Sequence, residues 1–512
     1  MKRRIYKQGV ILIISLIMTG CSIQGDFTEL SGPYLGQKTP GSDPELFMPG
    51  LISTNNLDIC IAFLQDGNVC VFSNDEDEIY YTYIRNGSWT VPERAPFPVG
   101  EGKIQYTAGP DGKTIYYFSS RPTSESDTRR DQNIWAMVWK GTDWAEPYPL
   151  PSPVNTEDNH ELYPSKARNG NLYFFSGWRR NNPLGDVYRS RLVNGEYRKQ
   201  ELLKDHISTE YHEIDPVIAP DESYIIFGSN RPGGYNFYDL YISFRKDDES
   251  WTHPVNLGKK INSLQANTIC ITPEGKYFFF SGYGNYDSSK GKKIESPLLE
   301  KIGDIDIFWI ETAFINDLKE EIISRSCAAD IIFDKFQGSG LQAAISKLDE
   351  LYSDQRNYYF SMFELLNICG EMIKDGEFDN ADKFYHSLLN TFPDDLRIMQ
   401  GYITVCIMNR QVQKGVTLLK EFWVKHPEKR SNLELEPLTS NLNFLKRTND
   451  EILLLDFIIT EFPNWPYGYY DIAQAYERNG KIELAIENCR KALELKPGFE
   501  GASALLSKLE NK

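Results

Sequence analysis

The chain has 512 residues, of which 41% are hydrophobic, enough for packed cores in more than one domain. It carries 72 Asp and Glu against 55 Lys and Arg, a formal net charge of −17. A surface this acidic repels phosphate backbones, which argues against a nucleic-acid-binding protein. The aromatic content of 13%, with 30 tyrosines, favours β-structure.

The first twenty residues have the pattern of a bacterial secretion signal. Basic residues within 2–7 precede an apolar run over 10–18, which is too short to span a bilayer. The stretch that follows, LIMTGC over 16–21, resembles a lipoprotein lipobox, in which a small residue precedes a cysteine that becomes acylated. The resemblance implies cleavage after residue 20 and lipidation of Cys21. An ordinary signal peptide followed by an incidental cysteine is the alternative.

The same resemblance implies a place for the protein in the cell. A lipidated Cys21 would anchor the chain to a membrane of the bacterial cell envelope. Ser22 rather than aspartate follows the cysteine, which in such lipoproteins implies the outer membrane, with the periplasmic or surface face left open. Residues 21–44 are rich in Gly, Pro, Ser and Thr and are predicted to form a tether.

The eight cysteines do not form a recognisable metal or disulfide pattern, since no CxxC pair or zinc spacing occurs. Cys60 and Cys70 flank a predicted two-residue turn at 66–67, but such a turn places Phe63 opposite Cys70. The resulting offset of about 10 Å along the strand is beyond the reach of a disulfide. We therefore predict that the cysteines after Cys21 are buried as small hydrophobic residues.

A pattern with a period of about fifty residues recurs five times between residues 45 and 315. Each copy has a tight turn, and an aromatic residue follows the turn six positions later. The turns are 45, 58, 52 and 53 residues apart, which predicts short strands repeated around an axis. The turns are Asp66-Gly67, Asp111-Gly112, Asn169-Gly170, Asp221-Glu222 and Glu274-Gly275, and the aromatic residues are Phe72, Tyr117, Phe175, Phe227 and Phe280.

Three short motifs give these copies a family likeness. They are Pro-Asp-Gly at 110–112, SNRPGG at 229–234 and Asp-Leu-Tyr at 239–241. With them the region resembles the TolB-type family of WD-like β-propeller repeats, which implies a β-propeller over residues 45–315 but indicates little about function. We predict five blades, with six as the alternative if residues 22–44 or 285–303 contain a degenerate copy.

Ring closure can also be predicted. The fifth copy lacks the Trp…Pro ending that three of the other copies have, whereas Phe47-Met48-Pro49 precedes the first copy where such an ending would stand. We expect residues 45–49 to supply the outer strand of the last blade, because a closed ring limits exposed sheet edges.

An arginine stands ten residues after three of the five turns. Its recurrence by blade favours a structural role, in which it bonds the polar residue that opens the next strand. The predicted pairs are Arg121 with Asn133, Arg179 with Asp186, and Arg231 with Asp239.

Two His-Glu pairs are the candidate ligand site on the propeller. His160-Glu161 and His212-Glu213 occupy equivalent places just before predicted inner strands, where loops line one mouth of the channel. Two histidines and two glutamates at one mouth could bind a metal or a cationic ligand. The alternative is that they are loop polar residues in contact with water. Convergence of the four side chains within about 5 Å of one point would favour the ligand site.

Catalysis finds little support in the sequence. Neither G-x-S-x-G nor H-E-x-x-H occurs, and the many carboxylates do not single out an acid/base pair. We therefore predict no catalytic residue and no cofactor.

From about residue 316 to 512 the apolar period changes from two to 3.6. Pro393, Pro427, Pro463 and Pro497 are 34, 36 and 34 residues apart, the length of a tetratricopeptide repeat. The resemblance is strongest in the last copy and predicts stacked helix pairs with a groove for a protein or peptide partner. A helical array that only supports the propeller is the alternative.

The leading functional hypothesis is a lipid-anchored scaffold of the cell envelope. The helical groove would bind a protein or peptide, and the propeller a protein or a glycan. The alternative is a glycan-active or other hydrolytic or lyase enzyme that uses the propeller channel, with His160, Glu161, His212 and Glu213 near the chemistry. A sensor that relays propeller binding to the helices is a third possibility.

Overall fold

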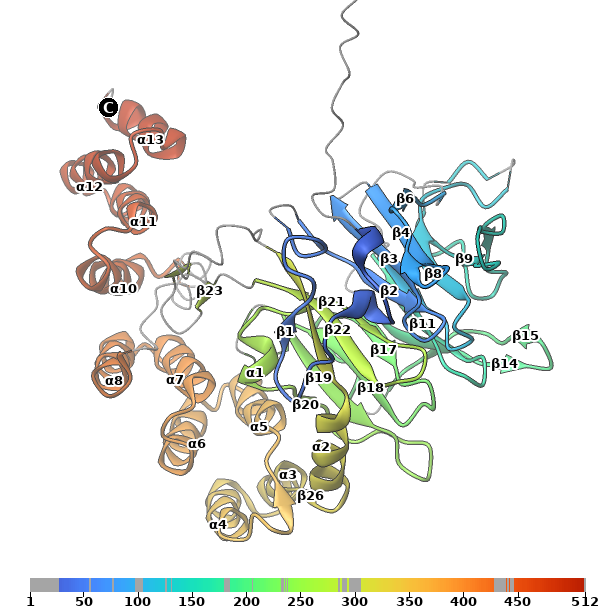
Figure 1. The fold of residues 1–512 in the computed structure, drawn as a ribbon. Coiled ribbons are helices and arrows are strands. Elements are labelled where there is room, and N and C mark those ends of the chain that lie inside the picture. Colours follow the sequence, from blue (N-terminus) through green and yellow to red (C-terminus); the bar gives the residue numbers. More distant parts are fainter. Residues whose placement is uncertain are drawn as a thin grey trace, which may run out of the picture.

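The computed structural model contains a β-propeller followed by an array of paired helices (Figure 1). No helix in the described part of the chain is both long and apolar enough to cross a bilayer. The predicted signal segment, Cys21 and the start of the predicted tether lie outside the described residues. The structure describes residues 27–510 except for 55–56, 76–77, 97–104, 125–126, 130, 179–184, 205, 232–233, 235, 237, 284–285, 288–291, 294–304, 428–438, 440–441 and 443–445.

Five antiparallel sheets form the propeller, which confirms the predicted blade number. The second strand of each sheet starts after a predicted turn and is largely buried, because neighbouring blades cover both of its faces. In order from the first strand outward, the sheets contain β2 (Ile61–Leu64), β3 (Val69–Asp75), β4 (Glu78–Arg85) with β5 (Ser88–Trp89) and β6 (Glu93–Arg94); β7 (Tyr106–Ala108), β8 (Thr114–Ser119), β9 (Asn133–Val138), β10 (Tyr148–Pro149); β11 (His160–Lys166), β12 (Leu172–Gly177), β13 (Asp186–Ser190), β16 (Glu201–Leu202); β17 (Glu213–Ile218), β18 (Tyr224–Ser229), β19 (Asp239–Phe244), β20 (Val255–Asn256); and β21 (Asn267–Ile271), β22 (Tyr277–Gly282), β25 (Asp306–Glu311), β1 (Glu45–Leu46).

Small elements decorate the blades. Two hairpins and one helical turn lie in the connections between strands. They are β14 (Leu192–Val193) with β15 (Glu196–Tyr197), β23 (Tyr286–Asp287) with β24 (Lys292–Lys293), and α1 (Lys259–Asn262).

The cysteines behave as predicted within the described residues. All seven that are described are free and buried. The turn at 66–67 places Phe63, rather than Cys60, opposite Cys70. These thiols therefore contribute to the packing of the cores, as small hydrophobic side chains do.

The segment expected to be a tether is in part packed on the propeller. Phe27 in η1 (Phe27–Glu29) stacks on Phe72 at 6.0 Å between ring centroids. Tyr34 in η2 (Tyr34–Gly36) makes edge contacts with Phe63 and Tyr277, both at 4.9 Å. The composition of this segment indicated a flexible linker, but its two aromatic side chains bury enough apolar surface to fix it on the first and last blades.

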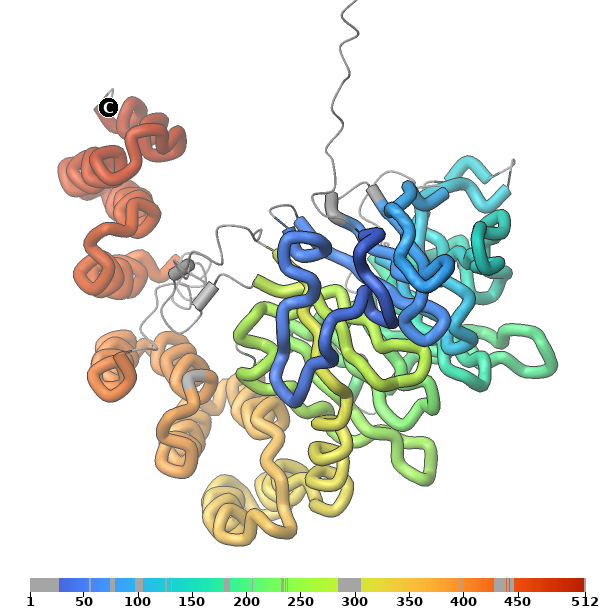
Figure 2. Tube along the Cα trace, viewed as in Figure 1, coloured from blue at the N-terminus to red at the C-terminus, as the bar shows by residue number. Residues whose placement is uncertain are grey.

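The helices follow the propeller as antiparallel pairs and curve away from it toward the C-terminus (Figure 2). The pair α11–α12 falls where the last predicted repeat lies. The bounds are α2 (Ala313–Ile323), α3 (Ala328–Ser339), α4 (Leu341–Tyr352), α5 (Met362–Lys374), α6 (Phe378–Thr391), α7 (Leu396–Met408), α8 (Val412–Lys425), α10 (Thr448–Glu461), α11 (Pro466–Arg478), α12 (Ile482–Leu495) and α13 (Glu500–Glu510), with β26 (Ser326–Cys327) paired in parallel to β27 (Tyr358–Tyr359).

One apolar core connects the propeller to the first helices. It runs from blades four and five, through Ile226 and Phe280, to Ile315 of α2, Ile332 of α3 and Leu365 of α5. Because this core is continuous, the first helix pairs are a rigid extension of the last two blades.

The predicted closure of the ring is confirmed. Glu45 and Leu46 of β1 pair with Trp309 and Phe308 of β25. The Phe47 ring is fully buried, and its centroid lies 5.0 Å from that of Trp309. The N-terminal end of the propeller thus completes its last blade.

Replacing Phe47 by alanine tests how much the closure stabilises the propeller. We expect Phe47→Ala to lower the free energy of unfolding by about 3–5 kcal/mol, because it leaves a cavity among the aromatic rings. Urea denaturation followed by tryptophan fluorescence measures the change. Val91→Ala is the control, since Val91 is 65% exposed and its truncation should have little effect. A loss below about 1 kcal/mol for Phe47→Ala would show that the closure matters little.

Candidate functional site

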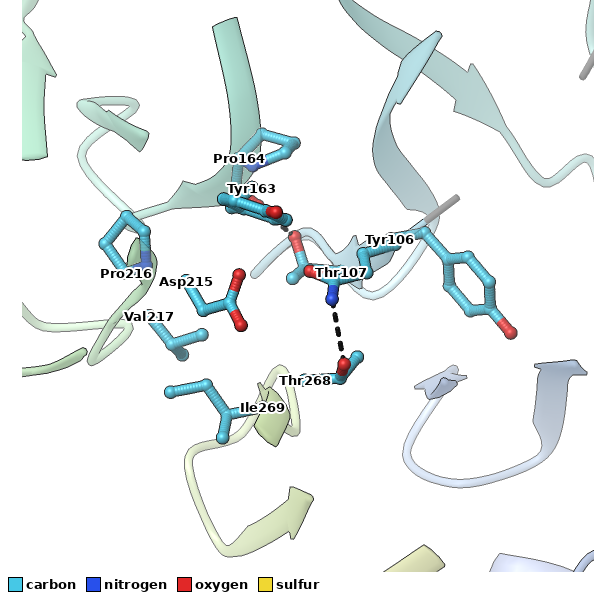
Figure 3. A pocket seen from close by; sticks show the side chains of 10 residues that line it. Tyr106, Thr107, Tyr163, Pro164, Asp215, Pro216, Val217, Thr268 and Ile269 are labelled. Atoms are coloured by element: carbon cyan, nitrogen blue, oxygen red, sulfur yellow. Dashed lines mark hydrogen bonds between the residues drawn. The ribbon is translucent and has the colours of Figure 1, made fainter. Parts of the chain in front are cut away.

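The space on the propeller axis is small. Residues at the starts of β7, β11, β17 and β21 leave a cavity of about 10 Å³, room for about one water molecule. The inner strands bulge here, and Tyr163, Asp215 and Thr268 adopt φ angles of 54°, 51° and 41°. These bulges turn the residues toward the axis (Figure 3). A sugar ring would not fit between the side chains in this arrangement.

Asp215 is the carboxylate that points into this space (Figure 3). Burial raises its pKa to about 7, although a hydrogen bond from the backbone of Thr268 opposes the shift. In the described part of the chain, its Oδ1 atom has no hydrogen-bond partner. The centre of the propeller therefore holds a group that changes charge near neutral pH.

The two predicted glutamates lie at the starts of β11 and β17 and are fully buried. Glu161 accepts hydrogen bonds from Thr156 N at 3.0 Å and Thr156 Oγ1 at 2.7 Å. Glu213 accepts the same two bonds from Thr209, both at 2.8 Å. Burial nevertheless raises the pKa of Glu161 to about 7. Both carboxylates hold the loop that leads into their strand, which is a structural role.

The two predicted histidines have partners of their own. His160 Nδ1 accepts a hydrogen bond from Gln132 N at 2.9 Å. His212 Nε2 accepts one from Trp178 Nε1 at 3.1 Å, and its Nδ1 lies 2.7 Å from Tyr238 Oη. None of the four predicted residues belongs to a described group of three or more ligand-type side chains within 4.8 Å of one another. A ligand at this mouth stays a prediction.

The two blade arginines within the described residues have structural roles, but with other partners than predicted. The Arg121 guanidinium lies 5.3 Å from the Trp135 ring. Arg231 pairs with Glu213 at 3.2 Å rather than with Asp239. Arg179 lies outside the described residues. The spacing in the sequence predicted where these arginines lie along a blade. It did not predict the loop that folds back over them.

A larger cavity lies at the junction between the propeller and the first helix pairs. Its volume is about 930 Å³. The propeller contributes the loop over 206–211 and His253, and the helices contribute residues of α3, α5, α6 and α7. Its wall has aromatic groups and charges of both signs. Examples are Tyr211, Phe363, Lys374 and Glu371.

Arg231 fixes the propeller side of this cavity. Its guanidinium donates hydrogen bonds to the carbonyls of His206 at 3.1 Å and Ile207 at 2.8 Å. The same group lies 4.8 Å from the centre of the Phe363 ring on α5. A planar, permanently charged group can bind two carbonyls and a ring face at once, so the loop and α5 are held together.

His253 lies between two acidic side chains from the helices. Its Nδ1 is 2.9 Å from Glu364 Oε1 on α5, and its Nε2 is 2.8 Å from Asp330 Oδ1 on α3. Burial opposes protonation of this ring, but the bonds and charges of Asp330 and Glu364 outweigh it and raise the pKa to about 9. The imidazole of His206 packs against it, with 3.6 Å between ring centroids.

Sequence reasoning missed this junction cluster. His253 stands in the Trp-Thr-His-Pro ending of the fullest propeller copy, and His206 in the preceding loop. Their acidic neighbours come from the other domain, at positions that follow neither repeat. The rarity of histidine, with six in the whole chain, is the feature of the sequence that could have pointed to this cluster.

Comparisons with known proteins support the helical part. Residues 466–499 match the tetratricopeptide repeat family, which confirms the repeat predicted over α11 and α12. No curated protein matches the chain. The TolB-type resemblance of the propeller stays a prediction.

Three similar solved structures each cover less than a third of this chain. A crystal structure of MamA is 21% identical over 28% of this chain and 83% of that one, with a TM-score of 0.20. MamA from Desulfovibrio magneticus RS-1 is 16% identical over 29% and 92%, with a TM-score of 0.19. The first TPR of Spaghetti (RPAP3), bound to the HSP90 peptide SRMEEVD, is 15% identical over 29% and 88%, with a TM-score of 0.16.

The raised pKa of Asp215 predicts that the stability of the folded protein depends on pH. The pKa of this carboxyl group is about 7 in the folded chain against an ordinary value of 3.8. Between these values the unfolded chain loses the proton while the folded chain keeps it, so stability falls as the pH rises through this window. Asp215→Asn removes the effect. The contribution of Asp215 to the free energy of unfolding of the unaltered protein should fall between pH 4 and pH 8, and the variant lacks this contribution. We therefore expect the difference between the two proteins to change by at most about 4 kcal/mol over this range, in favour of the variant.

Urea denaturation at several pH values within this window measures the difference. Asp247→Asn, at an exposed position, is the matched control and should run parallel to the unaltered protein. A constant offset between Asp215→Asn and the unaltered protein across the window would contradict the assignment.

Proposed function

We propose that this protein is a scaffold that binds a peptide segment of a partner protein in the junction cavity. The observation that carries the proposal is the cavity of about 930 Å³ bounded by the propeller loop and the first helix pairs. This volume lies at the upper end of the usual range for ligand pockets. Stacked helix pairs present extended binding faces. The helices that line this cavity precede the matched repeat over 466–499, and the propeller bounds the cavity on its other side.

The lining suits a peptide better than a small apolar ligand. Phe333, which is 36% exposed, and Tyr211 offer surfaces for an apolar side chain. Lys374 is paired with Glu371, and Arg397 with the aspartate two residues before it; both cations line the cavity, where a carboxylate of the partner can share them. Glu371 lies on the same wall and can meet a basic group. Charged and aromatic groups on one wall match a peptide with mixed side chains, since protein interfaces combine aromatic contacts with polar ones.

We further propose that lipidation of Cys21 anchors the mature chain in the bacterial cell envelope, at the outer membrane. The basic start, the short apolar run and the lipobox-like stretch over 16–21 support this placement. An anchored scaffold would hold its partner close to the membrane, which raises the effective concentration of the two proteins.

A bulky side chain at Gly370 tests the cavity directly. Gly370 is on α5, lines the cavity, and has no atom within 4 Å of the position that a Cβ would take. Gly370→Phe should therefore fill space without disturbing the helix. The matched control is Gly338→Phe on α3, which is also free of contacts at Cβ and lies outside the cavity lining.

The measurement is capture of partner proteins from envelope extracts of the source bacterium on immobilised protein comprising residues 21–512. We expect Gly370→Phe to reduce capture by at least about tenfold, the effect of losing 1.4 kcal/mol of binding energy. Gly338→Phe should capture as the unaltered protein does. Equal capture by Gly370→Phe and the unaltered protein would overturn the assignment of the binding site.

A further inference from the structure

Three side chains from different elements meet at the edge of the junction cavity. His206 comes from the loop before β17, His253 from the segment before β20, and Glu364 from the first turn of α5. Each offers one ligand atom, and the three atoms lie within 4.8 Å of one another. All three residues line the cavity, so an ion could reach them from solvent.

Their spacing is close to that of a metal site. Glu364 Oε1 is 2.9 Å from His253 Nδ1 and 3.5 Å from His206 Nδ1. Zinc binds nitrogen and oxygen at about 2.0–2.2 Å with tetrahedral geometry, which places neighbouring ligand atoms about 3.3–3.6 Å apart. Both distances from Glu364 are within about half an ångström of this spacing. The ligand nitrogens of the two histidines lie within 4.8 Å of each other, so a rotation of the exposed His206 side chain would bring the three atoms around one ion.

Asp330 provides the support that a metal-binding histidine usually has. Its Oδ1 lies 2.8 Å from His253 Nε2, the ring nitrogen that faces away from Glu364. A carboxylate on the second nitrogen fixes the orientation of the ring and makes the first nitrogen a better ligand. Cys327 lies near His253 and Asp330 as well, but it does not line the cavity.

We propose that His206, His253 and Glu364 bind a zinc ion, with Asp330 as the positioning residue for His253. Two nitrogens and one oxygen suit Zn²⁺ better than the oxygen-preferring ions Mg²⁺ and Ca²⁺. Three protein ligands leave a fourth position open toward the cavity, where a water molecule or a carboxylate of a bound partner can coordinate. Because two ligands belong to the propeller and one to α5, the ion connects the two domains. This inference is independent of the proposed peptide binding.

Zinc binding is measured on the chain comprising residues 21–512, purified without a histidine tag and treated with a chelator. Zn²⁺ is then added in competition with a chromophoric chelator, and Co²⁺ absorption reports tetrahedral coordination. We expect one zinc ion per chain. Thermal unfolding, recorded with and without Zn²⁺, should shift to higher temperature when the ion binds.

His206→Ala is the main variant, because the His206 side chain is 43% exposed and its loss should leave the fold intact. We expect this variant to bind zinc at least about 100-fold more weakly, since even supporting residues cost 10–100-fold. Asp330→Asn, which keeps the size of the side chain, should weaken binding by about 10–100-fold. His386→Ala, at an exposed position on α6, is the matched control and should bind as the unaltered protein does.

Two results would overturn the site. If the unaltered protein binds no zinc at micromolar concentrations, the cluster is only an ion pair of a protonated His253 with the carboxylates of Asp330 and Glu364. Zinc binding of equal strength in His206→Ala and the unaltered protein would place the ion elsewhere.

Discussion

The buried ion pair between Glu213 and Arg231 is the interaction on which the junction of the two domains depends. Both side chains are fully shielded from solvent. Such a pair is tolerated only when further hydrogen bonds satisfy both charges, because desolvation otherwise outweighs the attraction. Thr209 donates a hydrogen bond to the carboxylate, and the carbonyls of His206 and Ile207 accept hydrogen bonds from the guanidinium. The loop over 206–209 is therefore fixed on the fourth blade, and with it one wall of the cavity.

The hydrogen bonding of the Glu213 carboxylate follows a pattern that recurs in the propeller. In three blades a buried acid accepts two bonds from a threonine a few residues earlier and so fixes the loop into the inner strand. This explains why Glu161 and Glu213 recur at equivalent places: the repetition reflects the fold. Side chains that could bind a ligand are better sought at positions that differ between the copies, as at His253, where the other Trp…Pro endings have Val91 and Glu146. The three pairs are Thr54 with Asp58, Thr156 with Glu161, and Thr209 with Glu213.

The difference between repeated and unrepeated positions also explains which parts of the structure could be predicted from the sequence. The five turns and the addition of residues 45–49 to the last blade were predictable, because the strands repeat along the chain at a spacing that can be counted. The cluster of His253, Asp330 and Glu364 was not, because its members come from two domains whose relative placement depends on packing. The sequence likewise did not show the fold of the loop before Glu213, in which Thr209 donates two hydrogen bonds to this carboxylate.

The arrangement of the helical cores suggests why binding at the junction suits this protein. Helix α7 contributes Tyr402 and Cys406 to the core shared with the propeller, and Ile403 and Ile407 to a separate core that extends through α12. One helix thus joins a part that is rigid with the propeller to a distal part that packs on its own. A partner bound in the cavity, as we propose, would contact α7 through residues such as Gln400 and Thr404, which line the cavity. Because helices in a close-packed core shift as units, binding there can change the orientation of the distal repeats without disturbing the blades.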